Sequence, residues 1–516
     1  MSRTSETPLH DSPENESERP RGARLTILTI ATATGMLLAA LDSNITATAM
    51  PTVVAALGGL DLYSWVFAGY ALASTTAMPL FGRLSDIYGR KRLYLGGMVL
   101  FVLASATCAA ANSMPVLIAG RAVQGIGGAA ILGLTFTIIA DLYPPERRGQ
   151  VQGVTSSAWA ISAIIGPAIG AFLVTTLGWR WVFLVNLPVS VIPIFLLSRL
   201  LHDRRRPAGQ RSVDFLGAFT LSASVICLMV AALLAGNDGR LLTPTIGALT
   251  VGCLVLLGVF IAIQRKVPAP TIPLDLFRGR MFLMGTIGSI VFGWVGFSIG
   301  VFVPLFAQGV TGGTALQAGA VLLPNSLGWS AAAAISGPLV RPLGYRRMSL
   351  LGFGLLLVSV AMLARMNQQS SLTEMAIAMT IAGLACGVLS PTLLLAIQNT
   401  VDPNQLGVAT GLAMFLRNIG YSVGVSVMGA VLAGGLVVNL GSAIADPGAL
   451  LTSGDTSTID PAVITQFRAA LAAAMHDVFL LFLIASVLGI VAALGMTGWH
   501  DARKSAPATE TPSPVA

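Results

Sequence analysis

Charged residues are scarce in this sequence. Asp, Glu, Lys and Arg make up 10% of its 516 residues, whereas a soluble protein carries about 25%. Hydrophobic residues account for 54% of the chain, and the mean hydropathy is +0.80. This composition excludes a water-soluble globular fold and predicts a protein whose main solvent is a lipid bilayer.

Cysteine and histidine are also few, with four of each. All four cysteines fall inside apolar stretches without the paired spacing of a disulfide or metal framework, so we expect no metal site. The sequence also lacks clustered catalytic side chains, a signalling domain and a Gly-rich loop ending in Gly-Lys-Ser or Gly-Lys-Thr. An enzyme, a receptor and an ATP-driven pump are therefore disfavoured, and we expect no cofactor.

Long apolar stretches fill most of the chain. A helix needs about 20 mostly apolar residues to cross a membrane. Fourteen stretches of this kind lie at about 25–50, 62–81, 93–111, 116–140, 154–177, 182–200, 216–235, 243–263, 282–309, 317–340, 348–363, 375–397, 408–436 and 475–499. The expected fold class is an all-α polytopic membrane protein.

Basic residues mark alternate loops. They follow the second, fourth, sixth, eighth and tenth stretches, for example at Arg90–Arg92, Arg147–Arg148 and Arg346–Arg347. Lys and Arg concentrate on the cytoplasmic side of short loops, so we expect an inner-membrane protein with both termini in the cytoplasm. This topology accounts for the net charge of +8 without nucleic acid, and membrane lipid is an expected partner. The polar ends, 1–23 and 500–516, are predicted to be disordered cytoplasmic tails.

Two loops repeat a pattern of glycines. Gly82 and Gly337 are separated by 255 residues, and so are Gly89 and Gly344. Such an echo is typical of a duplicated transporter. It predicts two six-helix bundles, 24–200 and 282–499, which rock about a site at the membrane midplane. The segment 201–281 between them is predicted to hold a linker and two extra transmembrane helices.

Several motifs resemble one family. They are the loop from Gly82 to Arg92, Leu41-Asp42 through Met50-Pro51, Arg121-Ala122-Val123-Gln124-Gly125, Asn186-Leu187-Pro188 and Arg417-Asn418-Ile419-Gly420. Over nearly its whole length the chain resembles the fourteen-helix drug:proton antiporter branch of the major facilitator superfamily. The resemblance implies two six-helix bundles plus two helices, and export driven by the proton gradient.

Asp42 is the main candidate for proton coupling, because it is the only ionisable residue between Leu25 and Leu60. A carboxylate at membrane depth is costly and tends to mark function, and a low-dielectric cavity favours its protonated form. Helical spacing places Gly35 and Thr46 on the same face. The alternative is that Asp42 lies in the wet periplasmic interface.

Arg121 and Gln124 are the expected partners of this acid. In the family, the arginine that matches Arg121 belongs to the proton pathway, and a nearby cation can hold a carboxylate in its charged form. Gln124 lies three positions further along and would reach the same cavity. Alternatively, Arg121 snorkels to the periplasmic surface as an interfacial anchor.

The loop after the second stretch is expected to gate the cytoplasmic side. Its candidate residues are Gly82, Asp86, Gly89, Arg90 and Arg92. Asp86 can pair with Arg90 or face a helix N-terminus of the other half, where a negative charge is favourable. The alternative is a solvated charge run that only sets topology.

The fifth stretch resembles the antiporter motif of the family through Gly153, Ser162, Gly166, Pro167 and Gly170. Ser162 and Ala171 stand where the family usually has glycine, which weakens the inference of export. Small residues let helices approach closely and the proline bends the helix. Ordinary helix packing is the alternative explanation.

Candidate residues of a substrate cavity are Trp65, Tyr70, Asn325, Phe415 and Arg417, although aromatic residues in spans mostly serve packing. Together these features predict a monomeric, proton-coupled antiporter that exports small amphipathic compounds such as drugs, antibiotics and lipophilic cations. The alternatives are a proton-coupled or facilitated transporter of one metabolite or lipid-like molecule in the same fold. A uniporter or importer would not need Asp42 for coupling.

Overall fold

The structure is a computed structural model. It describes residues 22–58, 62–202, 214–238, 243–267, 270, 272–313, 315–402, 405–440 and 461–496. The expected tails lie outside these residues, apart from residues 22 and 23. Within the described chain the regular structure is helical, which confirms the expected fold class.

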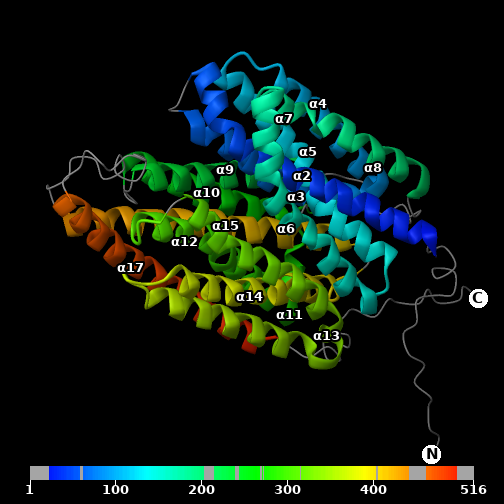
Figure 1. The fold of residues 1–516 in the computed structure, drawn as a ribbon. Helices are drawn as coiled ribbons and strands as arrows, with labels where there is room; N and C mark the ends of the chain where they lie inside the picture. The colour runs from blue at the N-terminus through cyan, green and yellow to red at the C-terminus, as the bar shows by residue number, and fades with distance from the viewer. Residues whose placement is uncertain are drawn as a thin grey trace, which may run out of the picture.

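The N-terminal half forms one helical bundle, which is the blue to green bundle at the top of Figure 1. Its helices are α2 (Ala23–Leu57), α3 (Tyr63–Tyr88), α4 (Arg90–Ala109), α5 (Met114–Leu142), α6 (Pro145–Thr176), α7 (Trp181–Leu184) and α8 (Asn186–Leu200). Buried apolar side chains from α2, α4, α5 and α8 form one core cluster of this bundle.

The C-terminal half forms the second bundle, below the first in Figure 1. Its elements are η2 (Leu274–Arg278), α11 (Arg280–Phe292), η3 (Gly293–Phe297), α12 (Ser298–Gly309), α13 (Ala315–Ala364), α14 (Leu372–Gln398), α15 (Leu406–Leu440) and α17 (Pro461–Leu494). The ninth expected stretch is therefore not one uniform helix, because η3 is a π-helical segment within it. The last helix begins at Pro461, earlier than the expected 475.

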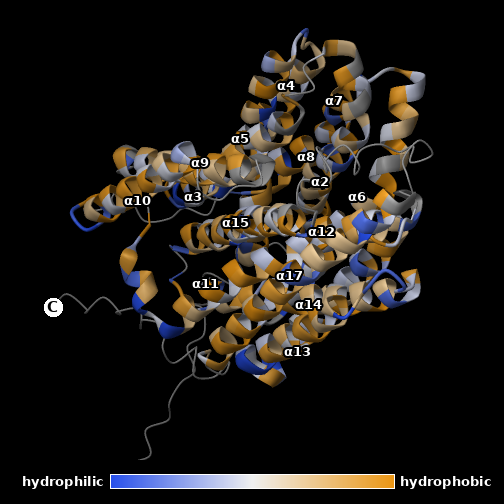
Figure 2. Ribbon diagram, turned by 90° about the vertical axis from the view of Figure 1, so that its left-hand side faces the viewer, coloured by the Kyte–Doolittle hydropathy of each residue, from blue (hydrophilic) through white to orange (hydrophobic). Residues whose placement is uncertain are grey.

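The described residues of all fourteen expected apolar stretches fall mainly on helices, and 317–340 and 348–363 are the two arms of α13. By length and apolarity, ten helices of the described chain are able to cross a membrane, or eleven if α6 counts as one span. The helix α6 bends by 45° between Arg147–Gly166 and Ala168–Thr176, as the proline at position 167 predicted. Hydrophobic residues run along much of the helical ribbon in Figure 2. The number of fourteen crossings stays a prediction.

The glycine echo has a structural counterpart. Gly89, between α3 and α4, has a φ of 95°, and Gly344, where α13 turns, has a φ of 76°. Both angles lie in the region that favours glycine over residues with a Cβ atom. The same sharp turn therefore occurs at equivalent positions of both halves, as expected for an internal repeat.

The extra pair lies on the seam between the two halves. It consists of α9 (Phe215–Asp238) and α10 (Pro244–Gln264), and α9 packs against both α3 and α15. Leu221, Val225 and Met229 of α9 belong to the same buried cluster as Met78 of α3 and Phe415 of α15. This apolar cluster joins the two halves.

Candidate functional site

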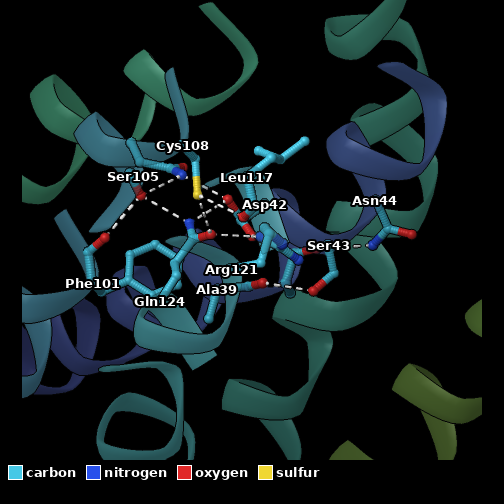
Figure 3. A network of polar contacts seen from close by, with 12 residues as sticks. Ala39, Asp42, Ser43, Asn44, Phe101, Ser105, Cys108, Leu117, Arg121 and Gln124 are labelled. Atoms are coloured by element: carbon cyan, nitrogen blue, oxygen red, sulfur yellow. Dashed lines mark hydrogen bonds and ion pairs between the residues drawn. The ribbon is translucent and has the colours of Figure 1, made fainter. Parts of the chain in front are cut away.

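Asp42 is fully buried in the N-terminal bundle, and its carboxylate accepts three hydrogen bonds. Figure 3 shows the carboxylate beside Arg121 and Gln124. Arg121 Nη1 lies 2.5 Å from Oδ2, and Gln124 Nε2 donates to Oδ1 at 2.8 Å. Asn186 Nδ2 of α8 donates to the same Oδ1 at 2.7 Å. The predicted proton-coupling residues are therefore brought together, and the carboxylate does not lie in a wet interface.

Arg121 has an exposed fraction of 1%, so it does not snorkel to the surface as an interfacial anchor. Its Nη1 also donates to Gln124 Oε1 at 2.6 Å, and its guanidinium carbon lies 4.5 Å from the centre of the Tyr70 ring. The Coulomb attraction of a buried ion pair is weakly screened, and each charge depends on the other. Asp42 and Arg121 thus neutralise each other inside the bundle.

Two residues of the site were not among the sequence candidates. Asn186 bonds both Asp42 and Ser105 Oγ, which lies 3.2 Å from Asn186 Nδ2. Ser105 of α4 also accepts a hydrogen bond from Gln124 Nε2 at 2.8 Å. The motif Asn186-Leu187-Pro188 was a signal for the first, whereas nothing in the sequence singles out Ser105. The network, which we call the Asp42 site, joins α2, α4, α5 and α8.

The predicted gating loop connects the two halves. Asp86 accepts hydrogen bonds from the backbone N–H groups of Gly407 at 3.2 Å and Val408 at 3.0 Å, in the first turn of α15. A Cβ atom on Gly82 would lie 2.5 Å from the Gly407 carbonyl oxygen, so this close approach requires glycine. The acid thus caps a helix N-terminus of the other half, where its charge is favourable.

Arg90 holds the same acid from its own side. It lies 3.6 Å from Asp86, pairs with Asp141 and donates to the Thr137 carbonyl oxygen at 2.9 Å. Both expected partners of Asp86 are therefore present at once. Arg92, in contrast, is exposed in the first turn of α4.

Polar bridges continue along this end of the interface. Gln152 of α6 donates to Gln398 Oε1 of α14 at 2.9 Å, and Arg148 donates to Asn399 Oδ1 at 3.1 Å. The backbones of Gly149 and Gly337 also pack directly against each other. The halves are closed together at the end that carries the gating loop.

The residues of the antiporter motif bring α6 close to its neighbours. Gly153 packs against the backbone of Ala333 in the other half. Gly166 packs against Asn44, and Gly170 against Thr48, both on α2. Ser162, the departure from the family pattern, accepts a hydrogen bond from Asn44 Nδ2 at 2.9 Å. The substitution therefore adds a polar contact to a closely packed helix pair.

The five cavity candidates do not form one group. Tyr70 lies under Arg121, and Phe415 is buried in the apolar cluster between the halves. Arg417 lies 5.4 Å from the ring centre of Phe297. Asn325 packs by its backbone against Gly383, and Trp65 is half-buried in the first turn of α3. Only Tyr70 joins the Asp42 site.

Comparison with known proteins agrees with this architecture. The family model of the Major Facilitator Superfamily matches residues 32–425. Multidrug resistance protein 3 of Bacillus subtilis (strain 168) is 33% identical over 477 residues, which are 90% of this chain and 93% of the relative. Multidrug transporter protein MdtP of the same organism is 34% identical over 421 residues, 81% of this chain and 77% of the relative.

A solved structure shares the fold. The human organic anion transporter MFSD10 has a TM-score of 0.61 at 16% identity, with 90% of this chain and all of that chain covered. At this identity the likeness concerns the fold alone. The helical architecture, the family match and the two bacterial relatives agree, and the chain therefore belongs to the Major Facilitator Superfamily of multi-pass membrane transporters.

Proposed function

We propose that this transporter is a proton-coupled antiporter that exports small amphipathic compounds, such as drugs, antibiotics and lipophilic cations, across the cytoplasmic membrane by alternating access. Two bacterial relatives have multidrug transport or resistance in their names, which supports this substrate class. The observation that carries the proton coupling is the Asp42 site, where one buried carboxylate holds donors from α5 and α8.

Protonation of Asp42 would change each of these contacts. The neutral acid loses its attraction to Arg121, and its hydroxyl hydrogen faces side chains that are themselves donors. Arg121 would then lack its counter-charge at a buried position, which is unfavourable. The helices α2, α5 and α8 therefore fit best in one arrangement with the carboxylate and in another with the acid. This difference is what proton-driven rocking of the bundles needs.

The closed end of the interface supplies the other element of the cycle. Following the distribution of basic residues, this end faces the cytoplasm, both termini lie there, and the arrangement is the outward-facing state. The Asp86 contact with α15 holds this state, and its release would open the cytoplasmic side. Each exchanged proton contributes about 1.4 kcal/mol per pH unit. Where net charge moves, the membrane potential adds about 2.3 kcal/mol per 100 mV.

Transport by proteoliposomes under an imposed pH gradient tests the proposal. The probes are three fluorescent compounds with one pyrene body and a trimethylammonium, hydroxyl or carboxylate end. The native protein, Asp42→Asn and Asp275→Asn are compared, because Asp275 belongs to an exposed ion pair with Arg278. We expect gradient-dependent transport of at least one probe by the native protein and Asp275→Asn, and its loss in Asp42→Asn. Equal gradient-dependent transport by all three proteins would refute the coupling role of Asp42.

A further inference from the structure

Arg417 is a second deeply placed cation, in the C-terminal half. It lies eleven residues after the start of α15, which is about 16 Å along the helix axis. This distance is about half of a hydrocarbon core of roughly 30 Å. The next residue, Asn418, contacts Met78 Sδ of α3 at 3.5 Å, so this level of α15 borders the other half. Arg417 is thus half-buried, about midway through the expected membrane span and near the interface of the bundles.

Unlike Arg121, Arg417 has no carboxylate partner within the described chain. The described acidic residues of the C-terminal half are Asp275, Glu374, Asp402 and Asp477, and none of them forms an ion pair with it. Its Nε atom is buried and has no hydrogen-bond partner there. An uncompensated cation at this depth is costly and tends to mark a substrate pathway.

One aromatic ring lies over the guanidinium group, and two further rings contact that ring. The Phe297 ring, 5.4 Å away, contacts the rings of Trp329 and Tyr421 at centre distances of 5.2 Å and 5.9 Å. Phe297 ends the π-helical segment η3, and such segments often occur at functional sites. Trp294 Nε1 and Ser298 Oγ, on and next to η3, are buried and unpartnered within the described chain. This region therefore offers apolar surface and hydrogen-bond donors, and it holds no carboxylate among the described residues.

The two halves therefore differ in the net charge of their membrane-embedded ionisable residues. Asp42 and Arg121 cancel each other, whereas Arg417 leaves one positive charge that no described acidic residue compensates. We propose that Arg417 binds the acid group of an amphipathic organic acid, and that Phe297, Trp329 and Tyr421 contact its aromatic or apolar body. A guanidinium group matches a carboxylate in geometry and charge. This assignment rests on the proposed export function. It narrows the substrates that bind at Arg417 to organic acids, because a cationic substrate would be repelled by the positive charge of Arg417.

Equilibrium binding to the detergent-solubilised protein tests the assignment without any proton gradient. Its outcome is therefore separate from that of the coupling experiment. The probes are pyrenebutyrate, pyrenebutanol and pyrenebutyl-trimethylammonium, which differ only at the polar end. We expect the native protein to bind the acid at least about tenfold more tightly than the ammonium compound.

Arg417→Gln should weaken binding of pyrenebutyrate by about ten- to a hundredfold and change binding of pyrenebutanol little. Arg417→Lys should restore part of the affinity. Arg365→Gln, at an exposed arginine of the same half, is the matched control and should bind as the native protein does. Unchanged binding of the acid by Arg417→Gln, or an equal loss for all three probes, would overturn the assignment. Tighter binding of the ammonium compound than of the acid by the native protein would also overturn it. This comparison needs no variant, so it holds even if Arg417→Gln does not fold.

Discussion

The ion pair of Asp42 and Arg121 makes a quantitative prediction about stability. Asp42→Asn preserves the shape of the side chain but leaves Arg121, with an exposed fraction of 1%, without a counter-charge. Removing one partner of a buried pair costs about 3–5 kcal/mol. In addition, the new amide NH₂ group would face Gln124 and Asn186, which now donate to the carboxylate. We therefore expect Asp42→Asn to lower the free energy of unfolding by about 3–5 kcal/mol.

The double variant Asp42→Asn/Arg121→Gln separates charge from packing. It removes both charges, so that no buried cation remains uncompensated. We expect it to be more stable than Asp42→Asn, with a coupling energy of about 2–3 kcal/mol between the two positions. The double variant is thus expected to be more stable than the single variant, although it lacks two native side chains and the single variant lacks one.

Unfolding in one detergent, followed by tryptophan fluorescence with denaturant and by heating, measures these differences. Asp275→Asn is the control, because its pair with Arg278 is exposed and such pairs contribute little. If Asp42→Asn were as stable as the native protein, the pair would not be buried as described. If the losses of the single variants simply added in the double variant, the two residues would not interact.

Three further variants test other contacts. Asp86→Asn weakens the cap of α15, which is worth about 1 kcal/mol. The distances between spin labels at the exposed Arg92 and Arg346 should therefore shift toward a population in which the two halves are separated at this end. An unchanged distance distribution would contradict the gating role. Asn186→Ala removes a donor to a charged group and should lower the free energy of unfolding by about 1.5–3 kcal/mol in the same assay, whereas no loss would exclude Asn186 from the site. Asp214→Ala removes the acceptors for Gly217 N–H and Gln264 Nε2. Amide hydrogen exchange in the first turn of α9 should therefore become faster. An equal exchange rate would show that the Asp214 contacts do not hold α9 and α10 together.

The sequence alone was sufficient to place the apolar helices and the residues that carry unusual chemistry. Membrane helices are determined by local composition, since each needs a run of apolar residues and satisfies its own backbone hydrogen bonds. An acid in such a run stands out for the same reason, and Asp42, Arg121 and Gln124 proved to be in contact. The turns at Gly89 and Gly344 were likewise indicated by glycines, because few other residues adopt a positive φ.

Only the tertiary structure decided which of these residues meet. Ser105 and Asn186 join Asp42 from helices far away in the chain, and the sequence spacing between them carries no information about helix packing. The same holds for α9 on the seam between α3 and α15, and for the separation of the cavity candidates. Among the described residues, the contrast between a paired Arg121 and an unpaired Arg417 depends on which side chains the packed bundles bring within hydrogen-bonding distance. That choice belongs to the assembled structure, because it is made by contacts between residues that are distant in sequence.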